Sequence, residues 1–313
     1  MTATNPDVLP FGPAAIAEAA RVIAGGGCVA VPTETVYGLA ADATDARAVA
    51  GIYAAKGRPS FNPLIVHVPD LAAAERIAAF DDVARDLAAR FWPGPLTLVL
   101  PVRADAGIAS LVTAGLATVA IRVPRHRAMQ ALLAAVGVPL AAPSANASGG
   151  ISPTRASHVV ASLGGRIPLV IDDGATEAGI ESTIVRGREI LRPGPLTADM
   201  LFGRAPGDTP ALRPSPENIV APGQLASHYA PSKPLRLDAI AAREGEWLIG
   251  FGAVRGDNNL SAAGDLTEAA ANLFDALHRA DAATATAIAV APIPATGIGE
   301  AINDRLARAA HRD

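Results

Sequence analysis

The sequence predicts an α/β protein made of a large domain, a proline-rich linker and a second, smaller α/β domain. Segments with apolar residues at helical spacing alternate with short apolar runs from residue 13 to residue 192, and the alternation resumes after residue 234. Half of the 313 residues are hydrophobic and 18% are charged, which is enough for a substantial core. Strands joined by helices of this length favour a mixed or parallel sheet.

The large domain is expected over residues 1–204. Its helices share an apolar stripe and are predicted at 13–27, 45–57, 71–80, 82–91 and 126–137. Its strands share a short apolar run and are predicted at 28–33, 63–68, 95–102, 117–124 and 138–144, with 167–173 and 182–192 completing the domain. Asp45 is expected to cap the second helix, and Gly57 is expected to end it.

A proline-rich segment separates the two domains. Residues 205–234 show neither helical nor strand periodicity, so they are predicted to form a semi-rigid linker. Residues 235–313 are predicted to form the smaller domain, with apolar segments at 246–252, 270–280, 285–293 and 299–310. The glycines of residues 250–256 do not fit G-x-G-x-x-G and no acidic residue is well placed for a ribose, so no dinucleotide site is expected there.

Charge and cysteine content exclude several classes of protein. The net charge is −4, so any anion must be met by a local cluster of cations rather than by a basic surface. The single cysteine, Cys28, excludes a disulfide framework or a cysteine zinc site within one chain. The first residues lack the order of a signal peptide, and no apolar run approaches the roughly 20 residues that span a bilayer. A soluble, cytoplasmic protein with no membrane contact is expected.

The chemistry must lie in polar residues at strand ends, where open α/β sheets gather ligands. Common hydrolase, kinase and zinc-peptidase motifs are missing, and no histidines pair at metal-ligand spacing. The strand-end set comprises Thr33, Glu34, Thr35, Tyr37, Lys56, Arg58, Ser60, Asn62, His67, Thr118, Arg122, Ser144, Asn146, Ser148, Ser152, Thr154, Glu181, Ser182, Thr183 and Arg192. It is rich in hydroxyls and cations and poor in carboxylates, which suits phosphates and an amino acid better than acid–base catalysis.

Each of these residues also has a purely structural interpretation. Thr35 would satisfy backbone groups at a strand end, and His67 would be a hydrogen-bonded core histidine. Arg122 and Arg192 would form surface ion pairs. Lys56 would sit at a helix C-terminus, where the helix dipole favours a cation. Singly, none of these residues decides between the two interpretations.

Lys56 stands out because only two of the 26 basic residues are lysines. A composition that favours arginine so strongly would be expected to use arginine for an ordinary surface cation. A lysine two residues before Arg58, where a helix ends, indicates a phosphate-binding loop with one compact charge and one bidentate fork.

Six short motifs occur in an order and spacing that resemble the YrdC-like family. They are PTETVYGL, K-x-R-P-x-x-N-P-L-I-V-H, P-S-A-N-x-S-G, ESTIV, LRPG and SHYAP, at residues 32–39, 56–67, 143–149, 181–185, 191–194 and 227–231. The last motif and the small second domain resemble the longer members, the two-domain threonylcarbamoyl-AMP synthases. The resemblance implies a YrdC-like twisted mixed sheet with a ligand cavity, followed by a smaller Rossmann-like α/β domain.

The resemblance also implies a nucleotidyltransferase reaction that joins L-threonine, bicarbonate or CO2, and ATP into threonylcarbamoyl-AMP and pyrophosphate. The product serves the threonylcarbamoyladenosine modification of tRNA next to the anticodon. The implied threonine contacts are Thr35, His67, Arg122, the backbone of Ala142, and Ser182. The implied ATP contacts are Lys56, Arg58, Asn62, Thr118, Ser144, Asn146, Ser152, Arg192 and Tyr229, of which Lys56 and Arg58 would be catalytic.

Further expectations follow from this reaction. Mg²⁺ should accompany ATP, ligated by phosphate oxygens and water, without a dedicated protein metal site. Downstream tRNA-modifying enzymes, and tRNA itself, are candidate partners. The linker is expected to fold over the ATP pocket, with Tyr229 touching the nucleotide. An RNA-binding module and another carbamoyl transfer are the alternatives; the near-neutral charge disfavours the first, and the lack of acylphosphatase and zinc-finger-like segments disfavours the second.

Overall fold

The large domain is built around one ten-stranded sheet. The structure is a computed structural model that describes residues 5–203 and 228–311. The strand order is β1-β8-β2-β3-β7-β4-β6-β5-β9-β10, with parallel and antiparallel neighbours. The strands are β1 (Asp7–Pro10), β2 (Val29–Pro32), β3 (Tyr37–Asp42), β4 (Ile65–His67), β5 (Leu96–Pro101), β6 (Thr118–Arg122), β7 (Leu140–Ala141), β8 (Leu169–Asp172), β9 (Thr183–Arg186) and β10 (Glu189–Arg192). The expectation of a mixed sheet is confirmed.

Eight helices of the described residues belong to the large domain. They are α1 (Pro13–Ala24), α2 (Ala46–Lys56), α3 (Leu71–Ile77), α4 (Asp82–Phe91), α5 (Ser110–Thr113), α6 (Arg127–Val136), α7 (Ala156–Leu163) and α8 (Ala198–Phe202). The predicted caps of α2 are confirmed: the Asp45 side chain accepts a hydrogen bond from the Arg47 amide, and Gly57 adopts the left-handed conformation with φ 60°. Gly57 therefore ends α2 between Lys56, the last helical residue, and Arg58, which lines the pocket described below.

The sequence missed several elements of this domain. The strands β1 and β3 and the helices α5, α7 and α8 were not predicted. Strand β3 is rich in small residues, which have low strand propensity, and it forms because it pairs with β2 on one side and β7 on the other. The motif at residues 32–39 is therefore a hairpin, and residues 33–36, of which the first three are polar, form the turn between two strands rather than a long loop.

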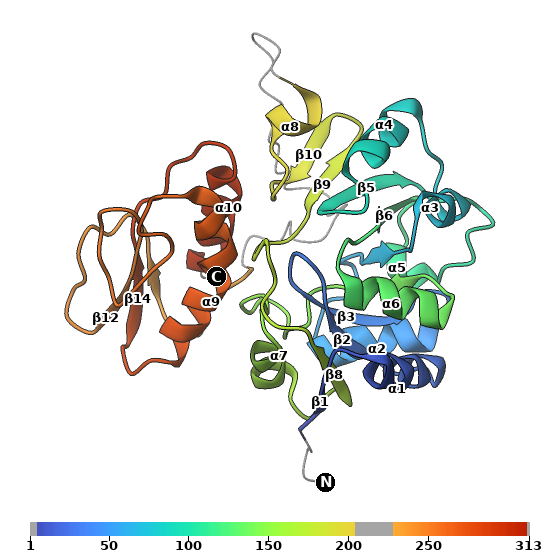
Figure 1. Ribbon diagram of the computed structural model, residues 1–313, viewed down its shortest axis with the longest axis horizontal. Coiled ribbons are helices and arrows are strands. Elements are labelled where there is room, and N and C mark those ends of the chain that lie inside the picture. The colour runs from blue at the N-terminus through green and yellow to red at the C-terminus, as the bar shows by residue number, and fades with distance from the viewer. Residues whose placement is uncertain (1–4, 204–227, 312–313) are drawn as a thin grey trace.

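The smaller domain has a four-stranded, all-parallel sheet in the order β11-β14-β12-β13. Its elements are β11 (Leu235–Arg236), β12 (Glu246–Gly250), β13 (Asn258–Asn259), β14 (Ala287–Val290), α9 (Leu266–Ala282) and α10 (Gly299–Ala310). Figure 1 shows α9 and α10 between this sheet and the large domain. The smaller α/β fold expected from the sequence is confirmed.

The two domains share a hydrophobic cluster. Val36, Ile151 and Ile180 of the large domain pack together with Tyr229 and with the apolar faces of α9 and α10. Gly179 lies so close to α9 that an added Cβ would meet the Ala271 backbone at 2.4 Å, so this contact requires glycine. The position of the smaller domain is thereby coupled to the loops at residues 150–152 and 179–182.

No helix among residues 5–203 and 228–311 has both the length and the apolar character needed to cross a membrane.

Candidate functional site

A pocket of about 550 Å³, its mouth included, opens where β4 and β6 end and the β2–β3 turn begins. The pocket is lined by Thr33, Thr35, Val36, Gly38, Arg58, Ile65, His67, Arg122, Ala142, Pro143, Ser144, Glu181, Ser182, Arg192, His228 and Tyr229. Segments from six different parts of the chain thus meet at one polar cavity.

Nine of the fourteen residues singled out from the sequence line this pocket. They are Thr35, Arg58, His67, Arg122, Ala142, Ser144, Ser182, Arg192 and Tyr229. The other five, Lys56, Asn62, Thr118, Asn146 and Ser152, stand behind or beside the lining. Thr118 is the most distant along its strand, because it begins β6 whereas Arg122 ends it. The ligand contacts assigned to these residues stay predictions.

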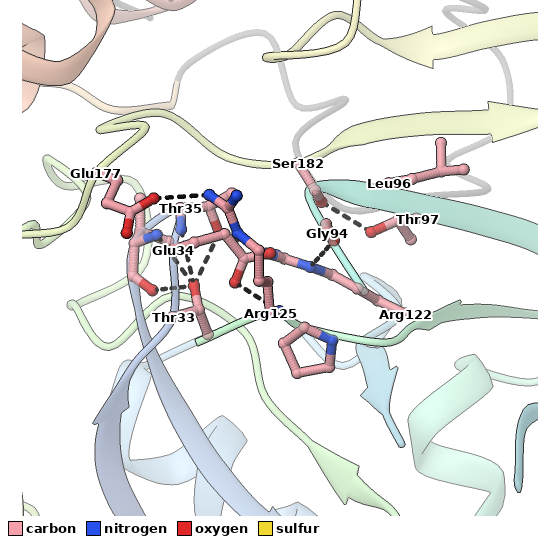
Figure 2. A network of polar contacts seen from close by, with 12 residues as sticks. Thr33, Glu34, Thr35, Gly94, Leu96, Thr97, Arg122, Arg125, Glu177 and Ser182 are labelled. Atoms are coloured by element: carbon pink, nitrogen blue, oxygen red, sulfur yellow. Dashed lines mark hydrogen bonds and ion pairs between the residues drawn. The ribbon is translucent and has the colours of Figure 1, made fainter. Parts of the chain in front are cut away.

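A buried ion pair forms one wall of the pocket. Arg122 Nη2 donates to Glu34 Oε1 at 2.6 Å, Arg122 Nη1 donates to Thr35 Oγ1 at 2.9 Å, and Arg122 Nε donates to the Gly94 carbonyl at 3.2 Å. Figure 2 shows the Arg122 side chain reaching from β6 to the turn that carries Thr33, Glu34 and Thr35. Burial raises the pKa of Glu34, but the charge and hydrogen bonds of Arg122 outweigh it, so the net shift is downward.

This geometry refines the expected role of Arg122. The alternative of a surface ion pair is wrong, because the side chains of Arg122 and Glu34 are only 4% and 2% exposed. Part of the guanidinium fork is already bound to a protein carboxylate. A threonine carboxylate would therefore have to share Arg122 with the Glu34 carboxylate. The sequence placed Glu34 among the strand-end residues but assigned it no ligand role.

Two cations behind and inside the pocket have no carboxylate partner among the described residues. Lys56 Nζ donates to the carbonyls of Ser144 and Asn146 at 2.5 and 2.6 Å. Arg58 donates to the carbonyls of Asn62 and Pro63 at 3.2 and 3.0 Å. Both side chains are buried, and burial is the main cause that holds the pKa of Lys56 well below its ordinary value and lowers that of Arg58 to about 10.

Lys56 lies at the C-terminus of α2, as its structural interpretation requires, and its contact with phosphate stays a prediction. Its ammonium group does not bind the carbonyls at the end of α2, and it is not an exposed point charge. It holds the loop at residues 144–146 from behind, while Arg58 lines the pocket itself. Uncompensated buried positive charge is costly unless an anion binds nearby, so this corner of the pocket is suited to an anionic ligand.

A second wall of the pocket is formed by the loop that carries Ser182. Ser182 Oγ lies 2.7 Å from Thr97 Oγ1, and Arg192 donates to the Ser182 carbonyl at 2.9 Å and to its hydroxyl at 3.1 Å. Arg192 is buried and binds this loop, so its interpretation as a surface side chain is wrong. Ser182 is thus held in place by the Thr97 hydroxyl and by Arg192.

Several buried polar atoms around the pocket have no hydrogen-bond partner among residues 5–203 and 228–311. They are Asn62 Oδ1 and Nδ2, His67 Nδ1, Asn146 Oδ1, His228 Nδ1 and Tyr229 Oη. Buried polar atoms in folded proteins are normally bonded, so such atoms mark positions where a ligand or water is expected. Burial, followed by the charge of Arg122, lowers the pKa of His67 to about 3, so its imidazole is neutral at physiological pH.

Tyr229 lies in residues 228–234, the described part of the predicted linker. Its ring packs against His228 and Phe274, and the amide of Ala230 donates to the Gly149 carbonyl at 2.8 Å. Residues 205–227 of the expected linker lie outside the described residues. Sequence reasoning missed His228, although it stands inside the SHYAP motif, and it included Glu181 among the strand-end residues but assigned it no ligand role.

The part of the chain that the structure describes holds no group of three or more His, Cys, Asp or Glu side chains able to bind a metal ion.

Two family models together cover most of the chain. One, described as "Telomere recombination" and covering the Sua5, YciO and YrdC proteins, matches residues 21–194. The other, described as "Threonylcarbamoyl-AMP synthase, C-terminal domain", matches residues 196–311. The chain is 40% identical to the threonylcarbamoyl-AMP synthase of Bacillus subtilis over 94% of its length and 92% of the relative's. It is 38% identical to that of Pyrococcus abyssi, over 93% and 92% of the two chains.

Solved structures of a two-domain relative are similar to this chain over nearly its whole length. The structure of P. abyssi Sua5 complexed with L-threonine is 35% identical, covers 97% of both chains and superposes with a TM-score of 0.86. A variant of that protein in which a histidine and a tyrosine are replaced by alanine superposes with a TM-score of 0.85, covering 97% of this chain and 96% of that one. The chain therefore belongs to the Sua5 family of threonylcarbamoyl-AMP synthases.

Proposed function

We propose that this protein is an L-threonylcarbamoyladenylate synthase. It joins L-threonine, bicarbonate or CO2, and ATP into threonylcarbamoyl-AMP and releases pyrophosphate, which makes it a nucleotidyltransferase. The product serves the threonylcarbamoyladenosine modification of tRNA next to the anticodon, and downstream tRNA-modifying enzymes, or tRNA itself, are its proposed partners in the cytoplasm. Full-length relatives that carry this name, and one whose structure contains L-threonine, support the proposal.

One feature of the pocket supports the proposal independently of the relatives. Lys56 and Arg58 are buried at the pocket without a carboxylate partner among the described residues, and hydroxyl and amide groups surround them. Phosphoryl chemistry demands this kind of site, because it depends on positioning and on neutralising charge rather than on a protein nucleophile. Mg²⁺ bound to the phosphate oxygens and water would supply further neutralisation.

The reaction balances without a covalent enzyme intermediate. The threonine nitrogen attacks the carbon of CO2 and loses a proton, which gives a carbamate. A carbamate oxygen then attacks the α-phosphorus of ATP, and the bond to the β-phosphate breaks, so that pyrophosphate leaves with the bonding electrons. His67, with a pKa of about 3, is too weakly basic to accept the amine proton efficiently at neutral pH, so its role is to form a hydrogen bond to threonine.

The direct test is to incubate the protein with Mg²⁺, ATP, L-threonine and bicarbonate. Pyrophosphate release should require both threonine and bicarbonate, and mass spectrometry should detect threonylcarbamoyl-AMP. Reactions without threonine, and reactions in buffer stripped of CO2, are the controls. Pyrophosphate release that is indifferent to threonine, or the absence of the adduct, would refute the proposed function.

Amino-acid selection gives a first prediction. The pocket places the Thr35 hydroxyl, the unpartnered His67 Nδ1 and the Ser182 hydroxyl around one region. A site built to hydrogen-bond a substrate hydroxyl rejects an analogue that lacks it, so kcat/KM for L-valine should be at least about 100-fold below that for L-threonine, whereas L-serine, which lacks only a methyl group, should lose less. Pyrophosphate release with each amino acid measures this; equal turnover of valine and threonine would contradict it.

A further inference from the structure

Arg305 in α10 is the most deeply buried cation that the smaller domain brings to the domain boundary. Its side chain is 0% exposed. Arg305 Nε donates to Glu181 Oε2 of the large domain at 2.9 Å, and Arg305 Nη1 donates to the neighbouring Asp304 at 2.8 Å. The guanidinium also lies over the Tyr229 ring, 5.3 Å from its centroid. An arginine in one domain therefore binds a carboxylate in the other.

Glu181 connects Arg305 to the pocket. Its other oxygen, Oε1, accepts a hydrogen bond from Ser152 Oγ at 2.5 Å, and Glu181 itself lines the cavity. The next residue is Ser182, whose backbone and hydroxyl are bound by Arg192. The contact with Arg305 therefore orients Glu181 and the adjacent Ser182 on one wall of the pocket, and Ser152, from another loop, is bound to the same carboxylate.

The charge of Glu181 makes this contact consequential. A carboxylate in a pocket for ATP would repel the phosphates unless a cation neutralises it. The charged or titratable groups that interact with Glu181 are Arg305 of α10, Arg192 of β10, and Tyr229, while Asp304 of α10 binds Arg305. Burial raises the pKa of Glu181, but Arg305 first and Arg192 second outweigh it, so the net shift is downward and the carboxylate stays ionised.

We infer that Arg305 is a positioning residue for ATP binding, supplied by the smaller domain, which acts by orienting and neutralising the Glu181 carboxylate at the pocket wall. Arg305 does not line the cavity, so it acts through Glu181 rather than by touching the substrate. The inference rests on the proposed function. It assigns the smaller domain a task at the active site beyond its packing against the large domain.

The test measures KM for ATP in the pyrophosphate-release assay for Arg305→Met and Glu181→Gln/Arg305→Met. Arg305→Met leaves Glu181 charged without its main partner, so KM for ATP should rise at least about tenfold with a smaller effect on kcat. In the double variant the amide still accepts the Ser152 hydrogen bond but carries no charge, so KM should return to within about threefold of the original value.

The pH dependence separates this role from a merely structural one. Loss of Arg305 removes the largest influence that lowers the pKa of Glu181, so the carboxylate of Arg305→Met should become protonated at higher pH than in the original protein. Protonation removes the repelling charge. The KM ratio between Arg305→Met and the original protein should therefore be larger at pH 8.5 than at pH 6.0, and the ratio for the double variant should not change with pH.

Arg308→Met is the matched control, because Arg308 stands one turn further along α10 and donates to the same Asp304 at 3.0 Å. Its KM for ATP should stay within about threefold. If Arg305→Met does not fold, as judged by circular dichroism, Arg305→Lys replaces it: the retained charge should keep KM within about threefold, and a larger rise would overturn the inference.

Two other results would overturn the inference. One is an unchanged KM in Arg305→Met, and the other is an equal, pH-independent loss in Arg305→Met and in the double variant. Failure of the proposed function would look different, because the original protein itself would then release no threonine-dependent pyrophosphate.

Discussion

Lys56→Ala is expected to lower the rate of threonylcarbamoyl-AMP formation at least about tenfold, equivalent to about 1.4 kcal/mol of lost transition-state stabilisation. The change removes a buried positive charge and leaves the carbonyls of Ser144 and Asn146 without their ammonium donor. The loop at residues 144–146, whose side chains are the proposed ATP contacts, would then shift. Arg58→Ala should lose at least as much, because Arg58 lines the pocket. Threonine-dependent pyrophosphate release measures both effects.

The chain contains its own matched control for this experiment. Lys233, the other lysine, also donates to two backbone carbonyls, those of Ala280 at 2.9 Å and Ala283 at 2.6 Å. It precedes β11, binds the end of α9 in the smaller domain, and does not line the pocket. Lys233→Ala should keep nearly full activity. Lys56→Arg should not restore activity, since a guanidinium is bulkier than an ammonium and the Lys56 site is 2% exposed. Full activity in Lys56→Ala and Arg58→Ala would contradict the phosphate-site interpretation.

Arg122→Met is expected to lower the free energy of unfolding by about 3–5 kcal/mol, because it leaves the Glu34 carboxylate buried without its ion-pair partner. Urea unfolding followed by circular dichroism measures the loss. Arg21→Met is the control: Arg21 pairs with Glu18 on the exposed face of α1, where the side chains are 72% and 40% exposed, and its loss should change the free energy of unfolding far less. The double variant Glu34→Gln/Arg122→Met should recover a large part of the lost free energy of unfolding. Equal losses in Arg122→Met and Arg21→Met would contradict the stabilising role of the buried ion pair.

The pH dependence of this loss has a defined sign. In the folded protein the pKa of Glu34 lies below its ordinary value of 4.5, so the pair stabilises the fold above that value and this stabilisation fades as the pH falls through the lower folded value. In Arg122→Met the buried carboxylate has lost its partner, so its pKa should rise and protonation should relieve the cost. The difference in stability between the two proteins should therefore be smaller at pH 4.5 than at pH 7.5.

Much of the fold was within reach of the sequence because its signals are local. The second helix illustrates this: an Asp45 cap, a run of apolar residues and a terminating Gly57 are all contained in thirteen consecutive residues, and each was found as predicted. The same holds for the strands that are buried on both faces, whose apolar runs predicted β2, β4, β5, β6 and β8. Strand β3 was missed because its small residues carry little strand preference of their own.

The members of the site were also predictable, but their contacts were not. The strand at residues 117–124 indicated Arg122, the motifs indicated Lys56 and Ser182, and the structure brings all three to one cavity and its immediate surroundings. The sequence did not reveal that Arg122 binds Glu34, because 88 residues separate the two. Nor did it reveal that the Lys56 ammonium group binds carbonyls about 90 residues away.

By itself, the sequence determined the α/β class, the two domains, the family and most residues of the pocket, because helix caps, apolar periodicity and short motifs are properties of neighbouring residues. Only the tertiary structure decided which charges neutralise one another. Glu181 and Arg305 lie 124 residues apart and in different domains, yet they meet at 2.9 Å in a place closed to solvent. Their pairing depends on how the domains pack, and because water is excluded there, that packing also sets the charge that a bound phosphate would encounter.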